Sequence, residues 1–232
     1  MEPTKVLVTR FVKGAIFSLH ETMGRLAAKI LNRLGLGVLC FFSDSSYLSV
    51  TGWLHSLKSG ESLLSNGDPS IWVTYPSRSF LAARVKPEMV IFEYGCGNST
   101  LWWAKRVKRV YSCEHNRVWY DKIKAKIPLN VDLCLRGLDS GYADRISEFK
   151  NIFDVVVIDG RDRVKCAYNV VEVLKPDGVV IWDNSERDRY AQGLEYMQSL
   201  GFKRIDFDGL GALAVTPFRT SILYRQNNCL GI

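Results

Sequence analysis

Histidine is scarce in this chain of 232 residues, which has three, and none of its six cysteines forms a C-x-x-C pair. No set of cysteine and histidine residues has the spacing that is typical of zinc sites, so the sequence predicts no structural zinc. Several cysteines fall inside apolar runs. We therefore expect buried free thiols in a reducing, cytoplasmic environment.

Long hydrophobic runs are also absent. The longest uncharged stretch near the N-terminus, residues 34–43, is too short to span a bilayer. A secretory signal would show a basic start followed by a sustained apolar core, and the N-terminus does not have this pattern. We also find neither an internal repeat nor a low-complexity tract. Because 47% of the residues are hydrophobic, we expect one domain with a full core plus an extension.

Acidic residues are few near the N-terminus. The formal net charge is +7. The first 33 residues contain six Lys or Arg residues, from Lys5 to Arg33, and only two acidic residues, Glu2 and Glu21. From Val6 to Leu34, apolar residues recur at helical spacing, which predicts one or two basic amphipathic helices. Two interpretations stay open: the apolar stripe packs on the main domain, or it lies on a membrane surface.

Residues 44–80 are rich in turns but also hold several aromatic side chains, among them Trp53, Trp72 and Tyr75. Aromatic residues in a polar segment usually fix it to a core, and they can also roof a pocket. We therefore predict an N-terminal extension of helices and loops over residues 1–84. We expect it to cover the substrate side of a main domain over residues 85–232.

After Pro87, apolar strands alternate with helical patterns. The predicted strands are 89–93, 109–114, 131–136, 153–159, 178–183, 202–207 and 221–225, and the predicted helices are 99–106, 117–126, 164–174 and 189–200. Nearly continuous apolar strands, such as residues 155–158, predict a parallel sheet with helices on both faces.

A glycine turn follows the first of these strands. Glu93-Tyr94-Gly95-Cys96-Gly97 ends the strand, and the polar run from Asn98 to Thr100 opens a helix. Glycine lets the backbone approach a ligand closely, and a helix N-terminus presents free N–H groups. The turn therefore predicts a nucleotide-type site above the strand end.

Polar residues also stand at the ends of the later strands: Glu114, Asp139, Asp159 and the pair Asp183-Asn184. In a doubly wound sheet, ligands bind outside the carboxyl ends of the strands. An acid at the end of the second strand can accept two hydrogen bonds from a ribose diol.

These motifs resemble the class I S-adenosylmethionine-dependent methyltransferases over about residues 85–232. The resemblance is carried by Glu93-x-Gly95-x-Gly97, by the acid Glu114 and by the closing pair of strands after Gly201. The run Glu-Tyr-Gly-Cys-Gly-Asn-Ser-Thr is similar to that of a bacterial subgroup of the family. The resemblance implies a doubly wound, mostly parallel, seven-stranded Rossmann-like sheet with an antiparallel last strand.

The same resemblance implies a set of cofactor residues. Gly95 and Gly97 would face the methionine part of S-adenosylmethionine, Glu114 would hold the ribose hydroxyls, and Asp139 or its neighbours would contact the adenine. Ser99 replaces the third glycine of the commoner motif. The full predicted set is Glu93, Gly95, Gly97, Ser99, Glu114, His115, Asp139 and Asp159.

Two rival functions are weighed against this resemblance. An NAD-dependent oxidoreductase needs G-x-G-x-x-G, and Thr100 stands where its last glycine should be. A scaffold protein could keep the fold without catalysis, but intact Gly95, Gly97 and Glu114 argue against a decayed site.

Methyl transfer requires an aligned acceptor and a group that removes its proton. Asp159 and Asp183 are the predicted catalytic residues, because the ends of their strands flank the site. With Asn184 they would also suit Mg²⁺, which resembles the catechol-type metal-dependent O-methyltransferases. Those enzymes place a lysine where this chain has Asp162. In the alternative, Asp159 acts without a metal and Asp183-Asn184 caps the next helix.

The acceptor is predicted from what the motifs lack. Asp159-Gly160-Arg161 departs from the Asp/Asn-Pro-Pro-aromatic order of enzymes that methylate the amino groups of bases. No RNA-binding module precedes the domain, so we expect no nucleic-acid partner. Arg161, Arg163 and Lys165 either bind an anionic group of the substrate or form a charged helix start. We expect O-methylation of a small molecule, sugar or glycan hydroxyl.

Overall fold

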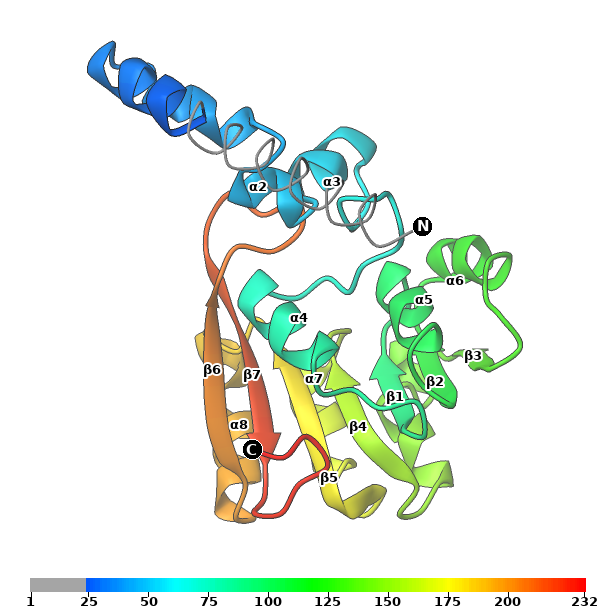
Figure 1. Ribbon diagram of the computed structural model, residues 1–232. Helices are drawn as coiled ribbons and strands as arrows, with labels where there is room; N and C mark the ends of the chain where they lie inside the picture. The colour runs from blue at the N-terminus through cyan, green and yellow to red at the C-terminus, as the bar shows by residue number, and fades with distance from the viewer. Residues whose placement is uncertain (1–23) are drawn as a thin grey trace, which may run out of the picture.

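The computed structural model describes residues 24–232, so the predicted helical pattern before residue 24 lies outside the described residues (Figure 1). A seven-stranded sheet forms the centre, in the order β3-β2-β1-β4-β5-β7-β6. Its strands are β1 Val90–Tyr94, β2 Arg109–Glu114, β3 Val131–Leu135, β4 Phe153–Ile158, β5 Leu174–Asp183, β6 Lys203–Gly209 and β7 Phe218–Tyr224.

The pairing of the strands confirms the predicted doubly wound sheet. Strands β1 to β5 pair in parallel, whereas β7 is antiparallel to both β5 and β6. The chain runs from β1 outward to β3, then returns to β4 on the other side of β1. This reversal places the topological switch point above the ends of β1 and β4.

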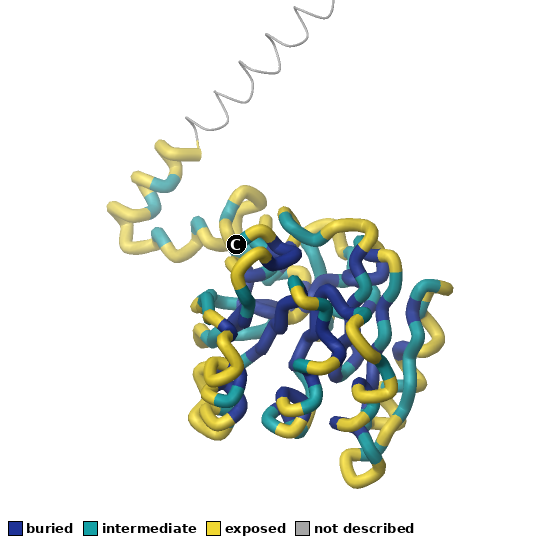
Figure 2. The backbone as a smooth tube through the Cα atoms, turned by 90° about the horizontal axis from the view of Figure 1, so that it is seen from below, coloured by how far each residue is buried: buried dark blue, intermediate teal, exposed yellow. Residues whose placement is uncertain are grey.

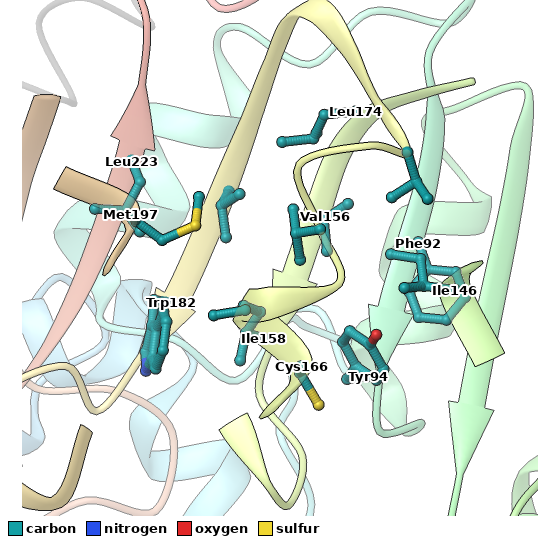
Figure 3. Close-up of a cluster of buried hydrophobic side chains, with 14 of the residues drawn as sticks. Phe92, Tyr94, Ile146, Val156, Ile158, Cys166, Leu174, Trp182, Met197 and Leu223 are labelled. Carbon is teal, nitrogen blue, oxygen red and sulfur yellow. The ribbon is translucent and has the colours of Figure 1, made fainter. Parts of the chain in front are cut away.

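Helices cover both faces of the sheet, and each face has its own hydrophobic core. The main elements are α4 Tyr75–Ala82, α5 Asn98–Ala104, α6 Arg117–Lys124, η3 Ala143–Glu148, α7 Arg163–Tyr168 and α8 Ala191–Ser199. One core joins Phe92 and Trp182 to Met197 of α8 (Figure 3). The other joins Ile91 to Trp103 of α5. Neighbouring residues of β1 point to opposite faces, which explains the continuous apolar pattern of the central strands.

One predicted helix is shorter than expected. The pattern over residues 164–174 predicted a single helix, but α7 ends at Tyr168 and β5 already begins at Leu174. Leu174 pairs with Phe153 of β4, and the register then shifts before Val155. The Val173 carbonyl already accepts from the N–H groups of Ile152 at 3.1 Å and Phe153 at 3.3 Å, so pairing with the start of β4 replaces the last part of the predicted helix.

The N-terminal part of the described chain lies at the end of the sheet where the parallel strands finish (Figure 1). It comprises a helix over residues 24–33, η1 Gly37–Phe42, α2 Tyr47–Val50 and α3 Trp53–Ser59. The indole of Trp53 donates a hydrogen bond to the carbonyl of Ala214, in the loop between β6 and β7, at 2.8 Å. The predicted boundary after residue 84 stays a prediction, although Ile71 and Leu81 already belong to the core.

Two predictions from composition can be compared with the described residues. All six cysteines are free, and Cys96, Cys113, Cys166 and Cys229 are buried. Between residues 24 and 232, no helix combines the length and the apolar character needed to cross a membrane.

The turn between β1 and α5 is built around a buried acid, Glu93, which is 1% exposed. The hydroxyl of Thr100 donates to Glu93 Oε2 at 2.5 Å and accepts a hydrogen bond from the Gly97 N–H at 3.0 Å. Thr100 therefore supplies the hydrogen bond that caps α5. Burial raises the pKa of Glu93 from its ordinary value of 4.5 to about 8, so this side chain holds a proton at neutral pH.

We predict a pH dependence of stability from Glu93. Between about pH 4.5 and about pH 8, the folded chain keeps a proton that the unfolded chain releases, so the free energy of unfolding falls as the pH rises through this window. Glu93→Gln keeps an acceptor for Thr100 and removes the titration. Urea unfolding of both proteins across this range should show a shallower fall for the variant, and parallel curves would contradict the assignment.

Candidate functional site

A pocket of about 830 Å³ opens at the switch point, within the size range of ligand sites. Its floor comes from the turn after β1 and from the ends of β2, β4 and β5. Gly60, Glu61, Ser62 and Trp72 line one side of the pocket, and the loop between β6 and β7 contributes Ala212, Leu213, Ala214 and Thr216. The N-terminal segment and this loop therefore supply the walls above the sheet.

The glycine turn brings the backbone to the edge of the pocket. Gly95 has φ +97°, a conformation that other residues adopt only with strain, and its N–H donates to the Cys113 carbonyl at 2.8 Å. A Cβ atom at Gly95 would lie 3.6 Å from the backbone of Gly160. On the other side of the turn, the indole of Trp119 donates to the carbonyl of Cys96.

Glu114 ends β2 at the pocket and is 3% exposed. Its Oε2 accepts from the Cys96 N–H at 3.0 Å, and its Oε1 accepts from the N–H groups of His115 at 2.9 Å and Asn116 at 2.7 Å. A carboxylate offers about four acceptor positions, so about one stays open toward a ligand. Glu114 thus fixes the glycine turn and still presents an acceptor to the pocket.

His115 lines the pocket next to Glu114. Its side chain is 27% exposed, and its Nδ1 lies 3.0 Å from Glu114 Oε1. The ring also meets that of Tyr142 edge-on, with centroids 5.7 Å apart. His115 therefore forms part of the pocket wall beside Glu114.

Three charged side chains meet at the ends of β4 and β5. Arg163, at the start of α7, donates to Asp159 Oδ1 at 2.9 Å and to the Gly160 carbonyl at 3.0 Å, and it also bonds the Asp183 carbonyl. Asp183 Oδ1 accepts from the Thr220 hydroxyl of β7 at 2.6 Å. The guanidinium of Arg163 is only 7% exposed, so it is a fixed internal cation.

Burial raises the pKa of both Asp159 and Asp183, and the negative charge of Asp159 raises that of Asp183 further, well above its ordinary value of 3.8. Arg163 opposes this rise at Asp159. Asp183 is 4% exposed, whereas the Asp159 side chain is 27% exposed. We therefore assign the proton to Asp183 and the negative charge to Asp159, the more open of the two.

The predicted Mg²⁺ ligands fit a divalent cation poorly, because they already have partners within the protein. Arg163 donates to Asp159, and the Thr220 hydroxyl donates to Asp183. In the part of the chain that the structure describes, no group of three or more His, Cys, Asp or Glu side chains is arranged to hold a metal.

The alternative prediction for Asp183 and Asn184, that they cap the next helix, is wrong. Neither η4 Asp188–Tyr190 nor α8 has a side-chain cap, and Asp183 bonds Thr220 instead. Asn184 adopts a left-handed conformation with φ 51°, which turns the chain away from the sheet.

The structure brings most of the predicted site residues to one pocket. Those that line it are Gly95, Gly97, Ser99, Glu114, His115, Asp159, Asp183 and Asn184. Glu93 lies beneath the turn, and Asp139 is exposed in η2 Leu138–Ser140, outside the pocket lining. The adenine contact of Asp139 stays a prediction.

Several residues of the pocket wall were not among those predicted from the sequence. Trp119 lies five residues after Glu114, and Arg187, Arg189 and Tyr190 follow β5. These residues could have been predicted from their position, because each follows closely after a strand that ends in an acid. The predicted basic cluster divides, because Arg161 and Arg163 line the pocket whereas the exposed Lys165 pairs with Asp162 at 3.8 Å.

No protein-family model matches the chain, and no curated protein matches its sequence. Solved structures do match. A precorrin-6y C5,15-methyltransferase from Geobacter metallireducens is 15% identical, with a TM-score of 0.53, over 66% of this chain and 88% of that one. An rRNA methylase from Streptococcus thermophilus is 18% identical, with a TM-score of 0.50, over 66% of this chain and 96% of that one.

A third structure is an S-adenosylmethionine-dependent O-methyltransferase from Thermotoga maritima. It is 17% identical, with a TM-score of 0.51, over 67% of this chain and 68% of that one. The names of the first two proteins give different acceptors, a precorrin and an rRNA, so the likeness concerns the shared sheet and its helices. With its strand order and its antiparallel β7, the chain has the fold of the class I S-adenosylmethionine-dependent methyltransferases.

Proposed function

We propose that this chain is an S-adenosylmethionine-dependent methyltransferase that methylates a hydroxyl group on a small molecule, sugar or glycan. One observation carries the proposal: the glycine turn, the Glu114 carboxylate and the Asp159 carboxylate line one pocket at the switch point. A dinucleotide site would also need the glycine turn and the acid after β2, but it would not need a further acid at the end of β4, where Asp159 stands.

The cofactor side of the pocket fits S-adenosylmethionine. The left-handed Gly95 keeps side-chain atoms away from the turn, and Glu114 has an acceptor position for a ribose hydroxyl. Bound S-adenosylmethionine supplies a methyl group that is activated by its positive sulfur. The carboxylates of Glu114 and Asp159 give this part of the pocket the opposite charge.

Asp159 suits the role of general base. Its raised pKa brings it closer to neutrality, which makes it a better proton acceptor than an ordinary aspartate. Arg163 fixes one carboxylate oxygen of Asp159, Oδ1, and the side chain stays 27% exposed in the pocket lining, within reach of an acceptor. In the proposed step, the acceptor hydroxyl gives its proton to Asp159 as its oxygen forms the new bond to the methyl carbon. The bond between that carbon and the positive sulfur would break at the same time, and neutral S-adenosylhomocysteine would leave.

One part of the pocket wall favours an acceptor that carries negative charge. It includes Arg161, Arg187 and Arg189, and the aromatic residues Tyr190 and Phe218 also line the pocket. Arg187 has an acidic neighbour, Glu186, at 3.6 Å. Guanidinium groups bind carboxylates and phosphates with paired hydrogen bonds, so a phosphorylated or acidic sugar would complement this wall.

Calorimetric titration with S-adenosylhomocysteine tests the cofactor assignment, with NAD as the comparison ligand. We expect binding of S-adenosylhomocysteine alone, and about tenfold or greater weakening in Glu114→Gln, since a hydrogen bond to a charged group contributes about 1.5–3 kcal/mol. Glu172→Gln, an exposed change before β5, is the matched control and should keep its affinity. Binding of NAD, or unchanged affinity in Glu114→Gln, would contradict the proposal.

Asp159→Asn should reduce the rate of methyl transfer by about a hundredfold or more, because it removes the general base. The asparagine oxygen can still accept from Arg163, so affinity for S-adenosylhomocysteine should change little. Transfer is measured with tritiated S-adenosylmethionine in a screen of phosphorylated and acidic sugars. Asp162→Asn is the control, since that side chain lies outside the pocket lining. Full activity of Asp159→Asn would exclude the role.

Chelation tests the fit of the site to a metal. Because Arg163 takes the place of a cation beside Asp159, treatment with EDTA followed by gel filtration should leave the transfer rate unchanged. Recovery of lost activity by added Mg²⁺, but not by NaCl of equal ionic strength, would instead show that a metal is required.

A further inference from the structure

The segment over residues 24–42, which we call the apolar arm, exposes an unusual number of large apolar side chains. They are Leu26, Ile30, Leu34, Leu36, Val38, Leu39, Phe41 and Phe42. Several are more than half exposed, including Leu34 at 66% and Phe42 at 61%. Single exposed apolar residues are ordinary on protein surfaces, but a continuous group of this size indicates an interaction site.

The apolar arm does not pack against the sheet. Within the described chain, no residue before Ile71 belongs to either hydrophobic core. Figures 1 and 2 both show the helix over residues 24–33 extending beyond the body of the molecule. One of the two interpretations of the N-terminal pattern was that its apolar stripe packs on the main domain. Residues 24–42 do not pack in that way.

Local hydrogen bonds give the apolar arm a defined shape. The Leu36 N–H donates to the Leu31 carbonyl at 2.8 Å, which ends the helix and starts η1. The Ser46 hydroxyl donates to the Phe41 carbonyl at 2.6 Å and joins the end of the arm to α2. The exposed apolar side chains are therefore displayed on a folded support that continues into α3.

The charges of the apolar arm identify its partner. Arg25, Lys29 and Arg33 are spaced by four residues and share one stripe of the helix, and the segment contains no acidic residue. Leu26, Ile30 and Leu34 follow each of them by one position and form the neighbouring stripe. A cationic stripe beside an apolar stripe is the pattern of helices that lie in the interface of an anionic bilayer.

A second copy of the chain fits the apolar arm less well than a bilayer. In a symmetric dimer the same surface patch meets itself, so three cations would face three cations across an apolar contact. An anionic lipid surface instead offers opposite charge to the cationic stripe and acyl chains to Phe41 and Phe42. We propose that the apolar arm docks the protein on an anionic membrane surface.

Docking would bring the pocket close to the lipid. The arm continues through α2 into α3, and the residues that follow α3, Gly60 to Ser62, line the pocket. Trp53 of α3 also bonds Ala214 of the pocket wall. The proposal itself does not depend on the proposed function, since lipid binding is measured without cofactor or acceptor.

Sedimentation of the full chain with vesicles tests the proposal. We expect binding to vesicles of mixed phosphatidylglycerol and phosphatidylcholine and little binding to phosphatidylcholine alone. Replacing Arg25, Lys29 and Arg33 together with glutamine should weaken binding on the order of a hundredfold, at about fivefold for each cation. Phe42→Ser should weaken it by about tenfold, because an apolar ring leaves the acyl boundary.

Matched variants separate the apolar arm from general charge and hydrophobicity. Replacing the exposed Lys108, Lys150 and Lys203 with glutamine gives the same net charge, and Leu129→Ser removes a side chain that is 99% exposed elsewhere. Both should bind the anionic vesicles like the original protein, with circular dichroism confirming that every variant is folded. Equal losses in these controls would overturn the proposal. So would absence of binding, or a dimer that Phe42→Ser dissociates in sedimentation equilibrium.

Discussion

The guanidinium of Arg163 determines the character of the site, because it joins the ends of β4 and β5 from inside the protein. Two carboxyl groups lie beside it, and they cannot both ionise without a large electrostatic cost. Since Arg163 bonds Asp159 directly, the charge belongs there and the proton belongs to Asp183. The same contact takes up one oxygen of Asp159 with a cation of the protein itself, and Asp159 is the more exposed acid of the pair.

Around the glycine turn, buried acids also fix their surroundings through hydrogen bonds. Glu93 lies under the glycine turn and bonds Thr100, while Glu114 accepts three N–H groups from the chain around the turn. Neither acid could be replaced by an apolar residue without leaving buried donors unpaired. The turn is therefore rigid before any ligand arrives, which lowers the entropic cost of binding.

The sequence predicted the sheet well, because apolar strands and their polar ends follow from local patterns. The seven-stranded sheet with an antiparallel last strand came from the family resemblance, and the structure confirms it. The patterns could not show that Arg163 points inward, since a basic residue at a helix start is usually exposed. They could not show Tyr190 or Leu213 in the pocket either, because the path of a long loop depends on tertiary contacts. The end of α7 was misplaced for the same reason, as pairing with β4 decides where β5 begins.

The position of β7 has a consequence for how the site is assembled. β7 is the last strand in the chain, yet it inserts between β5 and β6, so β6 joins the sheet only through it. The Thr220 hydroxyl that bonds Asp183 arrives on this strand. During synthesis, the strands that carry the glycine turn and Glu114 emerge first and can pair in parallel, whereas the acid pair gains its last hydrogen bond only after β7 docks. The part of the pocket around the glycine turn and Glu114 can thus form before β7 is in place, whereas the environment of Asp183 is complete only with it.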